Sequence, residues 1–122
     1  MPSGNWLAQA IAQIEQDGAV VRASLIDVRG SAPREAGAMM LIGRNAIWRT
    51  IGGGALEHDI MHHARQMIDD QTALPWDRRV VTAALGPDMG QCCGGHVRVL
   101  LERLDDRCGS VLHELAAVMP HR

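Results

Sequence analysis

Phenylalanine and tyrosine are absent from this 122-residue chain, which leaves three tryptophans as its large aromatic side chains. We therefore expect a core of Leu, Ile, Val, Met and Ala. Lysine is absent as well, so all 12 basic residues are arginines, whose planar guanidinium groups suit phosphate and carboxylate partners. The formal net charge of −2 gives no bulk attraction to nucleic acid or to an anionic membrane, and neither is expected as a partner.

Long apolar runs are also missing, since none reaches the roughly 18 residues that a membrane-spanning helix needs. Residues 1–5 lack the basic and apolar stretches of a signal peptide. Both features favour a cytoplasmic protein. The three cysteines are an odd number, which argues against a disulfide framework and, in a reducing compartment, predicts free thiols.

The periodicity of the apolar residues predicts helices and strands within one domain. Helices are expected up to Asp17, from the glycine turn at residues 52–54 to about Asp69, and near the C-terminus over 110–119. Gly18 suits the left-handed residue that follows a helix. Strands are expected at 19–28, 38–42, 46–51, 79–85 and 96–102. Strands joined as hairpins, with helices on the flanks, predict an α+β fold with a mixed or antiparallel sheet of about five strands.

Three consecutive glycines, Gly52, Gly53 and Gly54, separate the third predicted strand from the central helix. A strand, a glycine turn and a helix N-terminus together present unpaired N–H groups and the positive end of the helix dipole, which suits an anion such as phosphate. A tight connection that needs positive φ explains the glycines equally well. Glu57, in the first turn of the helix, is either a site residue or a carboxylate that complements the dipole.

Two further loops combine glycine with chemically capable side chains. In the first, Gly30 and Ser31 precede Pro33, whose ring stiffens the loop. The following Arg34 could then be held ready for an anion, with Ser31 as a hydroxyl donor. A solvated arginine and a simple turn serine are the alternative. The second loop is the cysteine-containing segment 86–95, and the three loops form a site if they meet at one end of the sheet.

Cys92 and Cys93 are adjacent, so a bond between them would need a strained peptide. Thiolates instead suit zinc, copper, iron–sulfur centres, molybdenum or the carriage of sulfur. We expect Cys93 to face a ligand, because Gly94 and Gly95 follow it and leave room for a large group. Cys92 then points the other way, and Cys108 is expected to be exposed without a glycine pocket. A buried, inert cysteine is the alternative.

His58 and His62 lie four residues apart on the central helix, a spacing that can bind metal. The same face carries Arg65 and Asp69 and lies opposite the apolar stripe, so a solvated polar face is the favoured interpretation. The stripe comprises Leu56, Ile60, Ala64, Met67 and Ile68.

In chain order, three segments resemble the motifs of one family. Residues 28–40 resemble its Gly-Ser-x-Pro-Arg loop followed by Gly-x-x-Met, 51–57 its Ile-Gly-Gly-Gly-x-Leu-Glu segment, and 93–99 with Glu102 its Cys-Gly-Gly-x-Val-x-Val stretch. The family is that of the xanthine dehydrogenase accessory proteins (XdhC/CoxI-like). The resemblance covers about residues 20–102, and the combination is specific although each glycine run alone is not.

This resemblance implies an accessory protein rather than an enzyme. Such a protein binds the molybdenum cofactor (molybdopterin) transiently and protects it while a cysteine desulfurase partner installs its sulfido ligand. It then delivers the cofactor to the apoenzyme of a xanthine dehydrogenase-type molybdenum hydroxylase. The expected cofactor site comprises Ser31, Arg34, Gly52, Gly53, Gly54, Glu57, Cys93, Gly94 and Gly95, with Cys93 as the metal ligand.

The sequence departs from the family pattern at its C-terminus. Members commonly continue into a second, Rossmann-like domain, whereas this sequence ends at Arg122. It is then either the N-terminal domain of a longer protein or a short member of the family, and a single domain over residues 1–122 is expected. If that second domain supplies half of the pocket, this chain alone binds nothing, and pairing through its sheet or final helix as a homodimer is the other option. Two other functions stay open: an interaction module that docks on a target enzyme, and an anion- or nucleotide-binding enzyme that uses Glu57.

Overall fold

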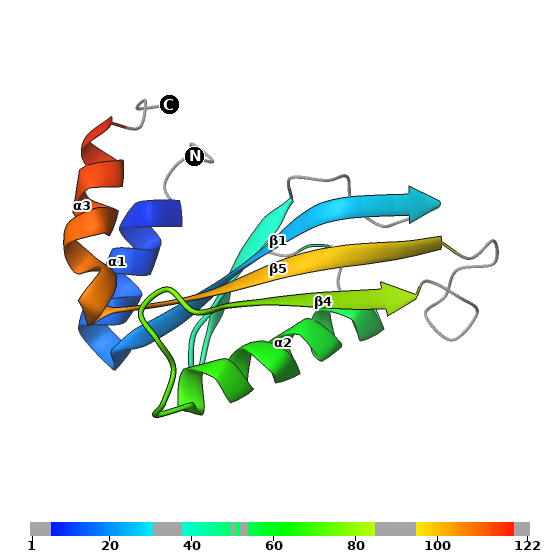
Figure 1. Ribbon diagram of the computed structural model, residues 1–122, viewed down its shortest axis with the longest axis horizontal. Helices are drawn as coiled ribbons and strands as arrows, with labels where there is room; N and C mark the ends of the chain where they lie inside the picture. Colours follow the sequence, from blue (N-terminus) through cyan, green and yellow to red (C-terminus); the bar gives the residue numbers. More distant parts are fainter. Residues whose placement is uncertain (1–5, 31–37, 50, 52–53, 85–94, 119–122) are drawn as a thin grey trace.

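The computed structural model describes residues 6–30, 38–49, 51, 54–84 and 95–118. Its elements are α1 (Trp6–Asp17), β1 (Ala19–Gly30), β2 (Met39–Ile42), β3 (Ile47–Trp48), α2 (Gly54–Asp69), β4 (Arg78–Ala84), β5 (Gly95–Asp105), a short 3₁₀ helix (Asp106–Cys108) and α3 (Gly109–Val118). The helix α2 runs along the sheet, while α1 and α3 stand side by side at one end of it (Figure 1). Within these ranges no helix combines the length and the apolar character needed to cross a membrane.

The strands form one sheet in the order β3-β2-β1-β5-β4, and every neighbouring pair is antiparallel. β1 is central and pairs with β5 from Ala19 opposite Asp105 to Gly30 opposite Gly95. The predicted α+β domain with a five-stranded sheet is thus confirmed, in its antiparallel form. Both strands are longer than predicted. The pairing between β1 and β5 continues beyond the residues in which apolar and polar side chains alternate clearly.

The third strand is shorter than the predicted 46–51. It ends after Trp48 because Arg49 has a φ of 64°, which an extended strand does not allow. Ile51 lies outside the strand and is nevertheless fully buried in the core. The hairpin turn predicted before this strand is confirmed, since the Gly43 N–H donates to the Ala46 carbonyl.

The core has two parts, one on each face of the sheet, because successive strand residues point to opposite faces. One cluster joins the inner faces of β1, β2, β4 and β5 to α2, and it buries the five residues of the predicted stripe, Leu56, Ile60, Ala64, Met67 and Ile68. The second cluster packs α1 and α3 on the other face, through Leu7, Ala10, Ile14, Val20, Met39, Leu41, Leu104, Cys108 and Leu112. The periodicity of α2 therefore predicted its buried face correctly.

A network of charged groups holds the C-terminal end of α2. Arg103 of β5 donates from Nε to the Met67 carbonyl at 2.7 Å and from Nη2 to the Ile68 carbonyl at 3.2 Å. Its Nη1 also donates to Asp105 at 2.6 Å. The last carbonyls of a helix lack partners of their own, so Arg103 caps α2 and fixes the helix along the sheet.

Candidate functional site

The described ends of the three glycine-rich loops lie at the same end of the sheet. Gly30, the last residue of β1, pairs with Gly95, the first of β5. Ala84, the last residue of β4, pairs with His96. The N-terminal end of α2 points toward this end as well, opposite the end that carries α1 and α3 (Figure 1). The flanking elements therefore have the arrangement that a shared site requires.

Three of the predicted site residues belong to the described part of the chain, namely Gly54, Glu57 and Gly95. The others lie outside the described residues: Ser31, Arg34, Gly52, Gly53, Cys93 and Gly94. Their meeting in one pocket stays a prediction. Gly95 opens β5 as part of its ladder with β1.

Gly54 is the first residue of α2 and has a φ of 67°, in the left-handed region that favours glycine. A Cβ built at this position would have no described atom within 4 Å apart from its chain neighbours. The backbone conformation, and not crowding, therefore requires glycine here. The predicted positive φ is thus found at this residue of the triplet.

We expect Gly54→Ala to lower the free energy of unfolding by about 1–2 kcal/mol, the cost of a left-handed conformation for a residue with a Cβ. Gly109→Ala is the matched control, because an added Cβ also meets open space there, but its φ is −56°. That control should be neutral or stabilising, since alanine has the higher helix propensity. Urea unfolding of both variants measures the difference, and equal stabilities would rule out strain at Gly54.

Glu57 lies in the first turn of α2, where the helix dipole favours a negative charge. Its Oε2 atom is buried, and no hydrogen-bond donor among the described residues reaches it. A buried acceptor without a donor costs about 1–3 kcal/mol, and more when it is charged. The oxygen is thus suited to accept an N–H or O–H of a ligand. A phosphate at the same point would be repelled, so any anion must bind to other groups of the site.

Cys108 was predicted to be exposed, and this is wrong. It is only 2% exposed, has a free thiol, and packs between α1 and α3 in the second core cluster. The 3₁₀ turn that ends at Cys108 points the side chain inward, a feature without a periodic sequence signal. Cys108 is therefore a small core residue, and it is no candidate for a ligand-binding thiol.

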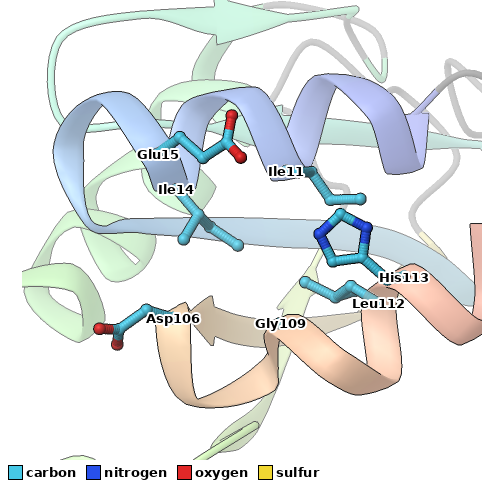
Figure 2. A pocket seen from close by; sticks show the side chains of 7 residues that line it. All are labelled: Ile11, Ile14, Glu15, Asp106, Gly109, Leu112 and His113. Carbon is cyan, nitrogen blue, oxygen red and sulfur yellow. The ribbon is translucent and has the colours of Figure 1, made fainter.

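A hollow of about 150 Å³ lies between α1 and α3 (Figure 2). Ile11, Ile14 and Leu112 line its apolar part, with Glu15, Gly109, Asp106 and His113 around them. It is smaller than the roughly 300–1,000 Å³ of typical ligand pockets. It also belongs to the helical end of the sheet, away from the glycine-rich end, so it is separate from the predicted site.

A second hollow, of about 170 Å³, lies on α2 and is lined by His58, Met61, His62 and Arg65. The two histidines stand out in the sequence as possible metal ligands, whereas Met61 was missed. The spacing His-x-x-Met-His was the available signal, because residues three and four apart on a helix are neighbours.

Comparison with known proteins shows a family to which this chain is similar. Residues 13–81, more than half of the chain, match the XdhC and CoxI family. The matched stretch includes the first two glycine-rich segments and Glu57, and it ends before the segment that contains Cys93. The chain is 34% identical over 106 residues to a probable xanthine dehydrogenase subunit of Bacillus subtilis (strain 168). It is 30% identical over 98 residues to the uncharacterized protein YqeB of Escherichia coli (strain K12).

The fold has a counterpart among solved structures. The crystal structure of a xanthine dehydrogenase from Bacillus halodurans matches 87% of this chain with a TM-score of 0.64 and 27% identity. The alignments cover 83% and 80% of this chain against the Bacillus subtilis and Escherichia coli proteins. They cover only 31% and 18% of those proteins, and 32% of the solved chain. The chain thus spans about a third or less of the length of these relatives.

Proposed function

The chain belongs to the XdhC and CoxI family, and from this premise we propose that it binds the molybdenum cofactor transiently at the glycine-rich end of its sheet. It then delivers the cofactor to a xanthine dehydrogenase-type molybdenum hydroxylase. Two of the similar proteins carry xanthine dehydrogenase in their names, which supports this choice of target. In this role the chain is an accessory protein without catalytic residues of its own.

The observation that carries the proposal is the buried Oε2 atom of Glu57, for which the described residues supply no donor. Molybdopterin contains a pterin ring with N–H groups, a phosphate and a dithiolene that holds the metal. The carboxylate of Glu57 fits the N–H groups of the pterin ring, because a charged acceptor makes strong hydrogen bonds to such donors. Glu57 therefore orients the ring at the start of α2.

The remaining groups of the cofactor match the other two loops. Arg34 suits the phosphate through its planar guanidinium, with Ser31 and the N–H groups of the glycine turn beside it. Cys93 suits the soft metal or the sulfur that a cysteine desulfurase partner supplies. Together the three loops thus offer groups suited to the phosphate, the pterin ring and the metal of one ligand.

We expect Cys93→Ser to reduce cofactor delivery to an apo-hydroxylase by about tenfold or more, the size typical of a weakened metal site. Delivery is measured as the hydroxylase activity regained after the apoenzyme is mixed with cofactor-loaded protein. Cys108→Ser is the control: its thiol is buried in the core, so that change should lower stability and leave delivery by the folded protein intact. Full delivery by Cys93→Ser would remove this thiol from the proposed site.

A second candidate function, an interaction module that docks on the hydroxylase, has one observation in its favour. Val111, Leu115 and Val118 lie on one side of α3 and are 46%, 36% and 77% exposed. Exposed apolar stripes often mark protein contacts. The two functions separate in the same assay. A docking module binds the apo-hydroxylase without cofactor and is insensitive to changes at Cys93 and Glu57, whereas a cofactor carrier is sensitive to both.

A further inference from the structure

The solvent-facing side of α2 carries a group of donors that the cofactor proposal does not use. His58, Met61, His62 and Arg65 line one hollow of about 170 Å³ on this helix. Positions three and four residues apart are neighbours on a helix, with about 5–6 Å between their Cβ atoms. His58 is therefore a neighbour of both Met61 and His62, and all three side chains line the same hollow.

The surroundings leave these donors accessible. His58 and His62 are exposed, and Met61 is half-buried against the edge of the main core cluster. The Nε2 atom of His62 lies 3.3 Å from the side-chain amide nitrogen of Gln66, an exposed contact that a ligand bound through Nε2 would replace. His63 lies 3.8 Å from Asp59, and its ring stands edge-on to that of His62, with 6.1 Å between the ring centroids.

We propose that His58, Met61 and His62 bind one Cu(I) ion. Thioether sulfur selects Cu(I), and imidazole is a good ligand for copper. In the described part of the chain no three His, Cys, Asp or Glu side chains gather as metal ligands, so the thioether of Met61 is what completes this set. The described residues that line the hollow include the Arg65 guanidinium and no carboxylate, so a soft monovalent ion fits better than a dication such as Zn²⁺.

The position of the three donors on a regular helix fixes the backbone from which they project. α2 is anchored by its buried stripe and by the Arg103 contacts at its C-terminal end. Side-chain rotation alone can then bring the donors together, and the helix backbone need not move. Residues on rigid elements hold ligand geometry more closely than residues on loops.

The test is an anaerobic Cu(I) titration against bicinchoninate, a competing chelator, combined with NMR of the methionine methyl groups. It uses the Cys92→Ser/Cys93→Ser protein, because thiolates would otherwise compete for the ion. The third thiol, Cys108, is buried. We expect one Cu(I) per chain, with a shift of the Met61 methyl signal, which Met61→Leu identifies by its loss.

We expect His58→Asn and His62→Asn each to lower the Cu(I) affinity by about tenfold or more. Losing a residue that only hydrogen-bonds to a metal ligand already costs about tenfold, and losing the ligand itself should cost at least as much. Both residues are exposed, so the fold should be retained, as far-UV circular dichroism would verify. His113→Asn, an exposed histidine on α3, is the matched control and should bind normally. An unmoved Met61 signal, or equal affinity in His62→Asn, would overturn the proposal. Tighter binding of Zn²⁺ than of Cu(I) would overturn it as well.

Discussion

Replacing Asp105 with alanine is expected to lower the free energy of unfolding by about 3–5 kcal/mol, the cost of breaking a buried charge pair. Asp105 is 5% exposed. It accepts hydrogen bonds from Arg103 Nη1 at 2.6 Å, from Arg107 Nη2 at 2.7 Å and from the Arg107 backbone N–H at 2.9 Å. The Arg103 side chain is itself only 11% exposed. Without Asp105 its positive charge stays buried and loses the carboxylate that compensates it.

The control for this change is an ion pair of similar length on the surface. Arg44 and Asp69 lie 2.6 Å apart, but their side chains are 48% and 66% exposed. Exposed pairs contribute about 0–1 kcal/mol, so Asp69→Ala should be nearly neutral. Denaturant unfolding of both variants gives the comparison. A loss of less than about 1 kcal/mol in Asp105→Ala would contradict the structural role of the network.

The same carboxylate predicts a dependence on pH. Burial raises the pKa of Asp105, but the hydrogen bonds from Arg107 and Arg103 outweigh it and hold the pKa below its usual value of 3.8. Because the folded pKa is the lower one, this stabilisation is present above 3.8 and is lost as the pH falls through the folded value. The stability difference between the native protein and Asp105→Asn should therefore shrink in acid below that range.

Replacing Glu57 with glutamine should weaken cofactor binding by about 10–100-fold, because hydrogen bonds to a charged group contribute about 1.5–3 kcal/mol. The free energy of unfolding of Glu57→Gln should rise or stay unchanged. The helix dipole loses about 0.3–1 kcal/mol of favourable interaction, while the charge of a partly buried carboxylate, whose Oε2 atom has no described donor, is removed. A loss of binding without a loss of stability identifies a residue placed for a ligand.

Glu114→Gln is the matched control for Glu57, since it makes the same chemical change at an exposed position on α3. Its cofactor affinity should equal that of the native chain. Fluorescence or absorbance titration with the cofactor measures the affinity, and thermal unfolding measures the stability. If Glu57→Gln binds the cofactor as well as the native chain and is no more stable, then the carboxylate is only a dipole partner at the start of α2.

The sequence allowed accurate prediction where the signal is local and periodic. The buried stripe of α2 follows the helical repeat, and Gly18 has the expected left-handed conformation, with a φ of 94°. The hairpin from β2 to β3 follows from its short turn, whereas the sequence left a mixed and an antiparallel sheet both open.

Features that depend on distant partners could not be predicted in the same way. Arg103 contacts the Met67 and Ile68 carbonyls, which lie more than thirty positions away in the sequence. Nothing in the sequence around Asp105 indicates that its carboxylate is buried in a network with arginines. Cys108 is buried because the 3₁₀ turn directs it toward α1 and α3. That the Oε2 atom of Glu57 has no described hydrogen-bond donor could not be predicted either, since this depends on which donors the fold brings near it.

The most direct test of the central claim is the molybdenum content of the protein after incubation with cofactor released from a molybdenum hydroxylase. The mixture is kept free of oxygen, separated by gel filtration and analysed for metal, with Glu57→Gln in parallel. Our account predicts molybdenum that co-elutes with the native chain at about one atom per binding site, transfers to added apo-hydroxylase, and is much reduced in Glu57→Gln. Native protein that elutes free of molybdenum at every cofactor concentration would contradict it.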